Sequence, residues 1–383
     1  MMRKKNTMSD SPKRSEATSG ASVRQNAGQT GGAVLAAAGG AAAVYVPVDA
    51  DFVLKDNAGE LEIDSNYSAQ SFWKDVRKRF VNKKSAVVGL FFVILLCLLA
   101  VIGPHMVPYG YAEQTDGKNL APRIQFIEYL GIFDGSETMT TTTGSKQVNG
   151  YAEKQLYDTF HWFGTDKYGR DIWSRTWNGA RVSLIIAVAA TIIDMVIGMS
   201  YGLISGYFGG KVDMVMQRIL EVSNGIPRLV IVTLLLLILK PGMVTIIFAL
   251  MLTEWIGMSR IARAEMLKLK EQEFVLASKT LGAGSFFIIF KEILPNIIGP
   301  IITQVMFSIP TAIFTEAFLS FVGLGIPVPQ CSLGSLISEG YNSFTTHPYQ
   351  IIPPIVVMAL LMLSFNLIAD GLREALDPKM KEM

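Results

Sequence analysis

The sequence has 383 residues, of which 50% are hydrophobic and 17% charged, and its formal net charge is +2. Long uncharged runs in such a composition exclude a large soluble domain and indicate an integral membrane protein. A balance this close to zero gives no reason to expect a nucleic-acid partner. The two cysteines, Cys97 in an apolar run and Cys331 in a loop, are too few for a disulfide framework or a metal site.

The first 70 residues differ in composition from the rest of the chain. Residues 1–70 are rich in Ser, Gly, Ala, Thr and Asn and poor in large apolar side chains. Such a segment buries too little surface to offset its ordering entropy, so we predict a disordered cytoplasmic tail. The stretch 31–46 resembles a signal-peptide core, but its Ala and Gly content favours a flexible linker.

A basic segment precedes the first long apolar run. Its cations are Lys74, Arg77, Lys78, Arg79, Lys83 and Lys84, and Asp75 is its only acid. Because basic residues accumulate on the cytoplasmic side of membrane spans, the N-terminus is expected in the cytoplasm. Residues 71–103 therefore form an amphipathic lead-in and a first transmembrane helix, which covers about 86–103.

A long polar segment, residues 104–180, follows the first span and is extracytoplasmic by alternation. Trp162, Trp173 and Trp177 lie near its end. Tryptophans at that place are typical of an interfacial anchor.

Five further spans are predicted in the core domain, residues 181–379. They cover about 182–205, 215–239, 243–258, 298–323 and 350–369. The loop 326–350 contains no Lys or Arg and is placed outside, whereas basic residues accumulate in the loop 260–296, which is placed in the cytoplasm. The sequence therefore predicts an all-α membrane protein with six transmembrane helices. Both termini are expected in the cytoplasm, and the protein is expected in the plasma or inner membrane of the cell.

The second span contains glycines at four-residue spacing. Gly198, Gly202 and Gly206 share one helical face. Small residues at this spacing let a second helix approach closely, so this face is predicted to pack on a neighbouring span.

Ionisable residues within the predicted spans are candidates for a translocation path, because each is expensive in lipid. Asp194, Glu254 and Glu316 are of this kind, and they either line such a path or form hydrogen bonds and pairs between spans. Glu221 and Arg228 are seven residues apart and are expected to neutralise one another on one helical face near the cytoplasmic surface.

Nothing in the sequence indicates catalysis. His105, His161 and His347 map to outer loops without metal-ligand spacing, so each is interpreted as an ordinary loop or interfacial residue. The stretch 206–212 resembles a phosphate-binding loop but has Val212 where the motif needs Ser or Thr. We therefore predict no catalytic residue, no cofactor, no metal and no ATP site in this chain.

The cytoplasmic loop 260–296 combines helix formers with an apolar stripe. Residues 260–281 favour a helix. The stripe on one side of this helix consists of Phe274, Val275, Ala277 and Leu281. An exposed apolar stripe needs cover, which is either a protein groove or the membrane surface.

Two glycines divide this loop into two helices. Gly282 stands where a helix C-cap needs a left-handed residue, and Gly284 loosens the chain before Ser285, which is expected to cap a second short helix. That helix is predicted to stop at Leu294 and Pro295, because proline does not continue the hydrogen-bond ladder.

The same loop resembles the EAA loop of ABC importer permeases, whose pattern is Glu-Ala-Ala, three residues, Gly, nine residues and Ile-x-Leu-Pro. The matching positions are Ala277, Gly282, Leu294 and Pro295. The departures are Leu276, Ser278 and Glu292.

Four further segments resemble the C-type subunit of the oligopeptide, dipeptide and nickel permease family. They are SFWKDVRKRFVNKKSAVVGL (71–90), HWFGTDKYGRDIWSRTWNGARVSL (161–184), LSFVGLGIP (319–327) and FNLIADGLREALDPK (365–379). The resemblance covers about 71–379 and does not explain the tail or an insert near 114–158.

The resemblance implies a type I ABC importer permease that imports oligopeptides or dipeptides. Such a subunit pairs with a second, different permease subunit, and two ABC ATPase subunits dock on the cytoplasmic loops and hydrolyse the ATP. An extracytoplasmic peptide-binding protein delivers the substrate, and membrane lipid surrounds the spans. The residues implied in ATPase coupling are Phe274, Ala277, Leu281, Gly282, Gly284, Ser285, Phe286, Phe287, Leu294 and Pro295.

Three alternatives remain open at this point. The first is a permease of the same family whose substrate is nickel or another small solute. In a different class, the chain is an ion-coupled secondary transporter, which predicts coupling carboxylates in broken helices. A membrane scaffold without transport would leave the intramembrane carboxylates without a purpose.

Overall fold

The computed structural model describes residues 72–141 and 144–376, which are mostly helical. The predicted tail 1–70 and the last three residues of the predicted core domain lie outside the described residues. The longer helices are α1 Phe72–Asn82, α2 Lys84–Ile102, α4 Ile172–Phe208, α5 Gly210–Gly225, α6 Arg228–Ile238, α7 Met243–Leu269, α8 Glu273–Thr280, α10 Leu294–Leu319, α11 Leu333–Asn342 and α12 Ile352–Leu376.

Five helical segments of the described chain are long and apolar enough to cross a membrane, and a bent pair adds a sixth. The five segments are Lys84–His105, Ile172–Phe208, Met243–Leu269, Ser285–Leu324 and Pro348–Leu376, and the bent pair is α5 with α6. The predicted all-helical fold with six spans is therefore confirmed, with the third span as the bent pair.

The third span is not the single straight helix that hydropathy predicts over 215–239. Helices α5 and α6 meet at an angle of 79°. Ile226 is extended (φ −85°, ψ 124°) and Pro227 precedes the first residue of α6. A proline has no N–H donor and disfavours a helical conformation in the residue before it, so the chain breaks here. A hydropathy average cannot register such a break, because it sums side-chain polarity and contains no information on backbone conformation.

The glycine face of α4 packs on α7, as predicted from the sequence. A Cβ atom at Gly202 would lie 2.2 Å from the carbonyl oxygen of Ser259, and one at Gly198 would lie 2.5 Å from that of Trp255. Both distances are shorter than any real contact, so only glycine permits this approach. Helix α4 also begins ten residues before the predicted span, because Asp171 caps it by accepting a hydrogen bond from the Ser174 N–H.

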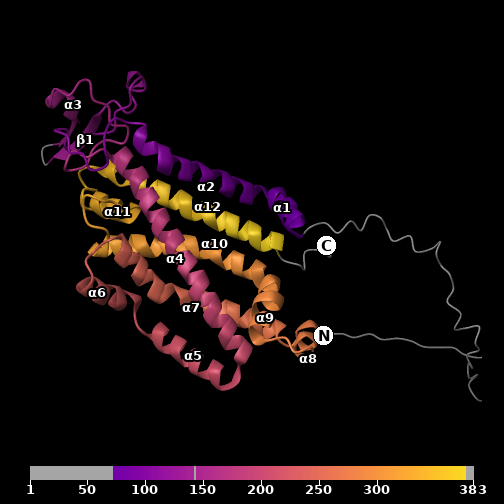
Figure 1. Cartoon of the computed structure of the whole chain (residues 1–383). Helices are drawn as coiled ribbons and strands as arrows, with labels where there is room; N and C mark the ends of the chain where they lie inside the picture. Colours follow the sequence, from indigo (N-terminus) through magenta and orange to yellow (C-terminus); the bar gives the residue numbers. More distant parts are fainter. Residues whose placement is uncertain (1–71, 142–143, 377–383) are drawn as a thin grey trace, which may run out of the picture. The chain divides into compact units, whose positions relative to one another are not determined.

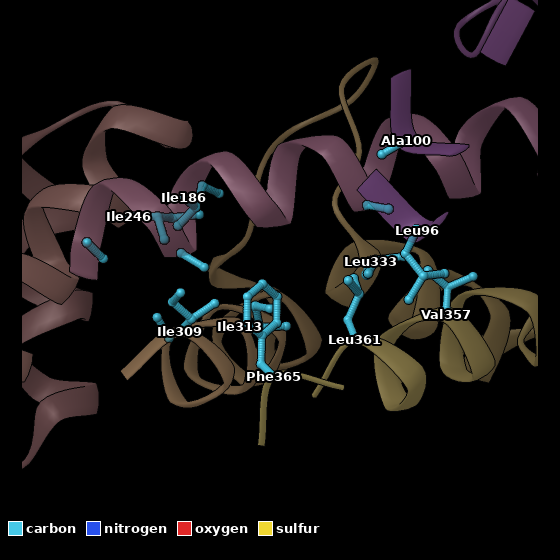
Figure 2. Packing of buried hydrophobic residues seen from close by; sticks show 14 of the residues in the cluster. Leu96, Ala100, Ile186, Ile246, Ile309, Ile313, Leu333, Val357, Leu361 and Phe365 are labelled. Atoms are coloured by element: carbon cyan, nitrogen blue, oxygen red, sulfur yellow. The ribbon is translucent and has the colours of Figure 1, made fainter. Parts of the chain in front are cut away.

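One apolar core joins the long helices. Figure 2 shows Leu96 of α2, Ile186 of α4, Ile313 of α10 and Phe365 of α12, which all belong to one buried cluster. Because protein interiors are close-packed, such a shared apolar core fixes the positions of the helices relative to one another.

Residues 106–141 and 144–171 form a polar lobe at one end of the helices, opposite α8 and the short helix α9 Ser285–Phe287 (Figure 1). It contains the hairpin β1 Ser136–Thr141 and β2 Gly144–Asn149, which pairs antiparallel, and the short helix α3 Gly150–Glu153. Three 3₁₀ turns also belong to the described chain, namely Gly103–His105, Glu128–Leu130 and Pro348–Gln350. The insert near 114–158 thus has a defined fold.

Buried ion pairs attach the polar lobe to the helices. The Arg170 guanidinium donates to Asp166 (2.7 Å) and to Glu339 of α11 (2.9 Å), and Arg175 of α4 binds the same two carboxylates. Because a buried charge is costly without a partner, this network holds the lobe to α4 and α11 as one piece. The sequence prediction for Trp177 is wrong, since it is buried beside Gly103 instead of anchoring at an interface.

Candidate functional site

A short helical unit leaves the helix bundle between α7 and α10, and we name residues 273–293 the elbow. Gly282 directly follows Leu281, the C-cap of helix α8, and has the left-handed φ of +83°. The Gly282 N–H donates to the Lys279 carbonyl and the Ala283 N–H to the Ser278 carbonyl, each at 3.0 Å. This pattern is a Schellman motif, in which a glycine closes the helix without a Cβ clash. The predicted left-handed helix end at Gly282 is confirmed.

Two details of the elbow differ from the sequence prediction. Gly284, not Ser285, is the N-cap of the short helix α9 Ser285–Phe287, and no side chain caps it. The helix also does not stop at Pro295. Residues Ile288–Ile293 form a π-helical segment that runs into α10, with the Leu294 N–H bonded to the Ile289 carbonyl five residues back. Pro295 then lies in the first turn of α10, a position that tolerates proline.

The elbow has one buried face and one exposed face. Val275, Ile288, Ile289 and Ile293 are buried in a cluster with residues of α4 and α7, such as Leu203. The exposed large apolar side chains are Phe274, Leu276, Leu281, Phe286, Phe287 and Phe290, among which Leu281 is 88% and Phe286 is 74% exposed. Of the other predicted coupling residues, Ala277, Gly282, Gly284, Ser285 and Pro295 are exposed and Leu294 is half-buried.

This division makes the elbow a rigid projection with an apolar outer surface. Fixed burial of one face prevents the unit from folding back to hide the other face. A contiguous exposed apolar surface on such a unit indicates a docking site. Nine of the ten predicted coupling residues are thus exposed, whereas Val275, which belongs to the predicted apolar stripe, is buried.

Two of the three predicted intramembrane carboxylates are enclosed by the helices. The Ser308 hydroxyl of α10 donates to Asp194 of α4 at 2.8 Å. Glu316 of α10 is fully buried and accepts hydrogen bonds from the hydroxyls of Ser183 (2.9 Å) and Ser320 (2.7 Å). Both carboxylates therefore connect α4 with α10.

The third carboxylate, Glu254 of α7, forms an ion pair that the sequence does not predict. Its Oε1 accepts a hydrogen bond from Nη1 of Arg228 at 2.8 Å. Glu221, the expected partner of Arg228, instead pairs with Arg218 at 2.5 Å. The expected pair is wrong because the break at Pro227 turns α6 away from α5, so the seven-residue spacing no longer places the two side chains on one face. The Ile226-Pro227 pair before Arg228 was the sequence signal that could have predicted this helix break.

Two of the three histidines, His161 and His347, have carboxylate partners. His161 is buried, and its Nδ1 lies 2.8 Å from Asp171. Nδ1 of His347 lies 3.1 Å from Glu137 in the polar lobe. Within residues 72–141 and 144–376, no three His, Cys, Asp or Glu side chains gather as a metal site.

Comparisons with known proteins identify the family. Residues 71–122 match the family described as the N-terminal TM domain of oligopeptide transport permease C, and residues 198–382 match the binding-protein-dependent transport system inner membrane component. The chain is 41% identical over 326 residues to the oligopeptide transport system permease protein OppC of Bacillus subtilis, covering 85% of this chain and 95% of that protein.

A second relative is the dipeptide transport system permease protein DppC of Lactococcus lactis, which is 43% identical over 322 residues and covers 82% of this chain and 92% of that protein. A solved chain of the MetNI methionine ABC transporter in an inward-facing conformation is 17% identical and aligns over 53% of this chain and 96% of that chain with a TM-score of 0.46. With two relatives of more than 40% identity along most of its length, the chain belongs to the family of oligopeptide and dipeptide permease subunits of binding-protein-dependent transport systems.

Proposed function

We propose that this chain is one of two permease subunits in an ATP-driven importer of oligopeptides or dipeptides. The names of the two relatives above support a peptide substrate over nickel or another small solute. The observation that carries the proposal is the elbow, because its exposed apolar surface is rigidly fixed to the transmembrane helices.

The distribution of basic residues supports the orientation of the chain in the membrane. The elbow and α1 carry lysines and arginines, such as Lys279, Lys291, Arg77 and Lys78, whereas the segment 326–350 at the lobe end contains none. Basic residues favour the cytoplasmic side. The elbow and both termini are therefore cytoplasmic and the polar lobe is extracytoplasmic in this proposal.

The elbow acts as a lever in the proposed mechanism. An ATPase subunit covers the exposed side chains of the elbow, and the buried face transmits its movement to α4 and α7. When the ATPase pair closes around ATP, it changes the side of the membrane to which the translocation path is open. ATP can shift this equilibrium because it binds the two states of the transporter with different affinity. ATP hydrolysis is carried out by the partner and not by this chain.

Two further partners complete the proposal. A second permease subunit forms the other half of the translocation path, and an extracytoplasmic peptide-binding protein docks at the lobe end. Burial of Asp194 and Glu316 supports a role for both in holding α4 to α10. Glu254 pairs with Arg228, which lines a pocket, and this pairing supports a place for Glu254 on the path.

Purification of the tagged chain from its native membrane in mild detergent tests this proposal. Mass spectrometry of the co-purifying chains is expected to find a second permease and two ATPase subunits. The Phe286→Asp variant is expected to lose the ATPase while retaining the second permease, since it puts a charge on the docking surface. Tyr129→Asp is the matched control, because Tyr129 is an equally exposed aromatic residue in the polar lobe. Recovery of the wild-type chain alone or as a homo-oligomer would favour a secondary transporter.

A further inference from the structure

The break between α5 and α6 places an arginine inside a predicted span. Arg228 is the first residue of α6 and pairs with Glu254, which lies near the middle of α7. The Glu254 side chain is 13% exposed, whereas that of Arg228 is 54% exposed. An ionised group in a span is expensive and is therefore a candidate functional group, most of all when it remains partly accessible.

The Arg228 guanidinium has donors to spare. Nη1 is bonded to Glu254, and the described residues provide no second side-chain acceptor for this guanidinium. A guanidinium carries five N–H donors in a planar fork that matches the two oxygens of a carboxylate. Helix α6 adds to the positive potential at this point, because the first turn of a helix presents N–H groups without intrahelical partners. The charge of Glu254 fixes the arginine in position and leaves the outer side of the fork open.

An apolar pocket begins beside this arginine. Its volume is about 200 Å³. Its walls come from α6, α7 and α10, and its apolar lining residues are Leu229, Val232, Leu250, Phe314, Phe318 and Leu319. Thr253 and Thr315 are the other polar residues in its lining, and the Thr315 hydroxyl lies 3.5 Å from Glu254. One cation at the rim of an apolar pocket fits a ligand that joins an anionic group to an apolar group.

We propose that Arg228 binds the C-terminal carboxylate of the transported peptide while the pocket takes the side chain of the last peptide residue. This inference rests on the proposed function, which supplies the peptide. A C-terminal residue has a carboxylate one carbon away from its side chain, so both groups fall within the reach of this site. The peptide carboxylate accepts hydrogen bonds from the guanidinium donors that Glu254 leaves open, and no covalent step is involved.

The pairing with Glu254 also explains how the site releases its ligand. An arginine that was buried without a partner would hold a carboxylate too tightly for transport, whereas Glu254 competes for the same guanidinium. Discontinuous transmembrane helices with a positive N-terminal end recur at sites for anionic substrate groups in transporters. The break at Pro227 therefore serves to aim both Arg228 and the start of α6 at the path.

A competition assay tests this inference with the whole complex, including its own binding protein, in proteoliposomes. One apolar peptide with a free C-terminal carboxylate and the same peptide with a C-terminal amide are supplied together, so that they compete for the same complex, and the uptake of each is measured. The quantity compared is the acid-to-amide uptake ratio of each variant relative to the wild type, so that the selectivity of the binding protein cancels.

Arg228→Gln is expected to lower the relative acid-to-amide ratio about tenfold, because it removes a charge-assisted hydrogen bond to the acid alone. Arg218→Gln is the matched control and is expected to leave the ratio unchanged, since Arg218 forms a similar ion pair on α5 but does not line the pocket. Arg228→Gln alone leaves the Glu254 carboxylate without its partner, which could impair folding. The double variant Arg228→Gln/Glu254→Gln removes this carboxylate as well and so relieves such a folding defect. It is expected to transport the amide and to show the same lowered ratio.

Three results would overturn the inference. An unchanged ratio in both Arg228 variants would mean that Arg228 does not contact the carboxylate. An equal loss of acid and amide uptake in both variants would mean that Arg228 supports the fold or pairs with an acid of the second permease. A wild-type complex that takes up neither peptide would instead refute the proposed function, and the inference with it.

Discussion

Replacing Leu281 and Phe286 by alanine separates docking on the elbow from the stability of the fold. Leu281 is 88% and Phe286 is 74% exposed, so most of their surface remains available for burial by a partner. Full burial of such a side chain contributes about 1.5–3 kcal/mol. Truncation to alanine is thus expected to cost about 1–2 kcal/mol of docking free energy at each position, or about tenfold in Kd.

The double variant is expected to weaken ATPase binding by about 100-fold if the two effects add. The Tm of the isolated chain is expected to stay nearly constant, because truncation of exposed side chains changes stability by about 0.5 kcal/mol or less. Ile293→Ala is the opposite control. Ile293 is fully buried in the anchoring cluster, and its truncation is expected to cost about 2–5 kcal/mol and to lower the Tm.

The assay is titration of the purified ATPase subunit against the permease in lipid nanodiscs, with thermal unfolding measured in parallel. An affinity of the double variant within twofold of the wild type would refute the docking surface. A fall in its Tm as large as that of Ile293→Ala would show that the two side chains support the fold instead.

Further substitutions probe the backbone and the packing. Gly282→Ala is expected to weaken coupled ATPase activity because a Cβ at a φ of +83° costs about 1–2 kcal/mol, whereas Gly282→Asn, which tolerates this conformation, should retain more activity. Gly202→Ala should lower the Tm by overpacking worth about 1–3 kcal/mol, while Gly257→Ala, whose Cβ would meet no atom within 4 Å, should not. Burial raises the pKa of the Cys331 thiol. In a Cys97→Ser variant, in which Cys331 is the one remaining thiol, maleimide labelling at pH 8 should therefore be slow in the folded chain and should become fast only when the chain unfolds.

The elbow shows how far local sequence reasoning reaches. Gly282 as a left-handed helix end follows from residue type alone, because the backbone conformation it needs is a local property. The continuation through Pro295 does not follow, since the π-helical segment before it depends on the burial of Ile288, Ile289 and Ile293 against other helices. Which side of α8 faces outward is likewise decided by those contacts, and Val275 faces inward as a result.

The membrane class, the six spans, the glycine face of α4 and the family resemblance follow from the amino-acid sequence. These features depend on apolar length, charge bias and residue size, which are local sums along the chain. The partners of the charged residues, in contrast, depend on how the helices pack. Arg228 and Glu254 are 26 residues apart and meet because Pro227 bends one helix toward another. Pairing across helices depends on their relative directions, and no periodicity within a single helix contains that information.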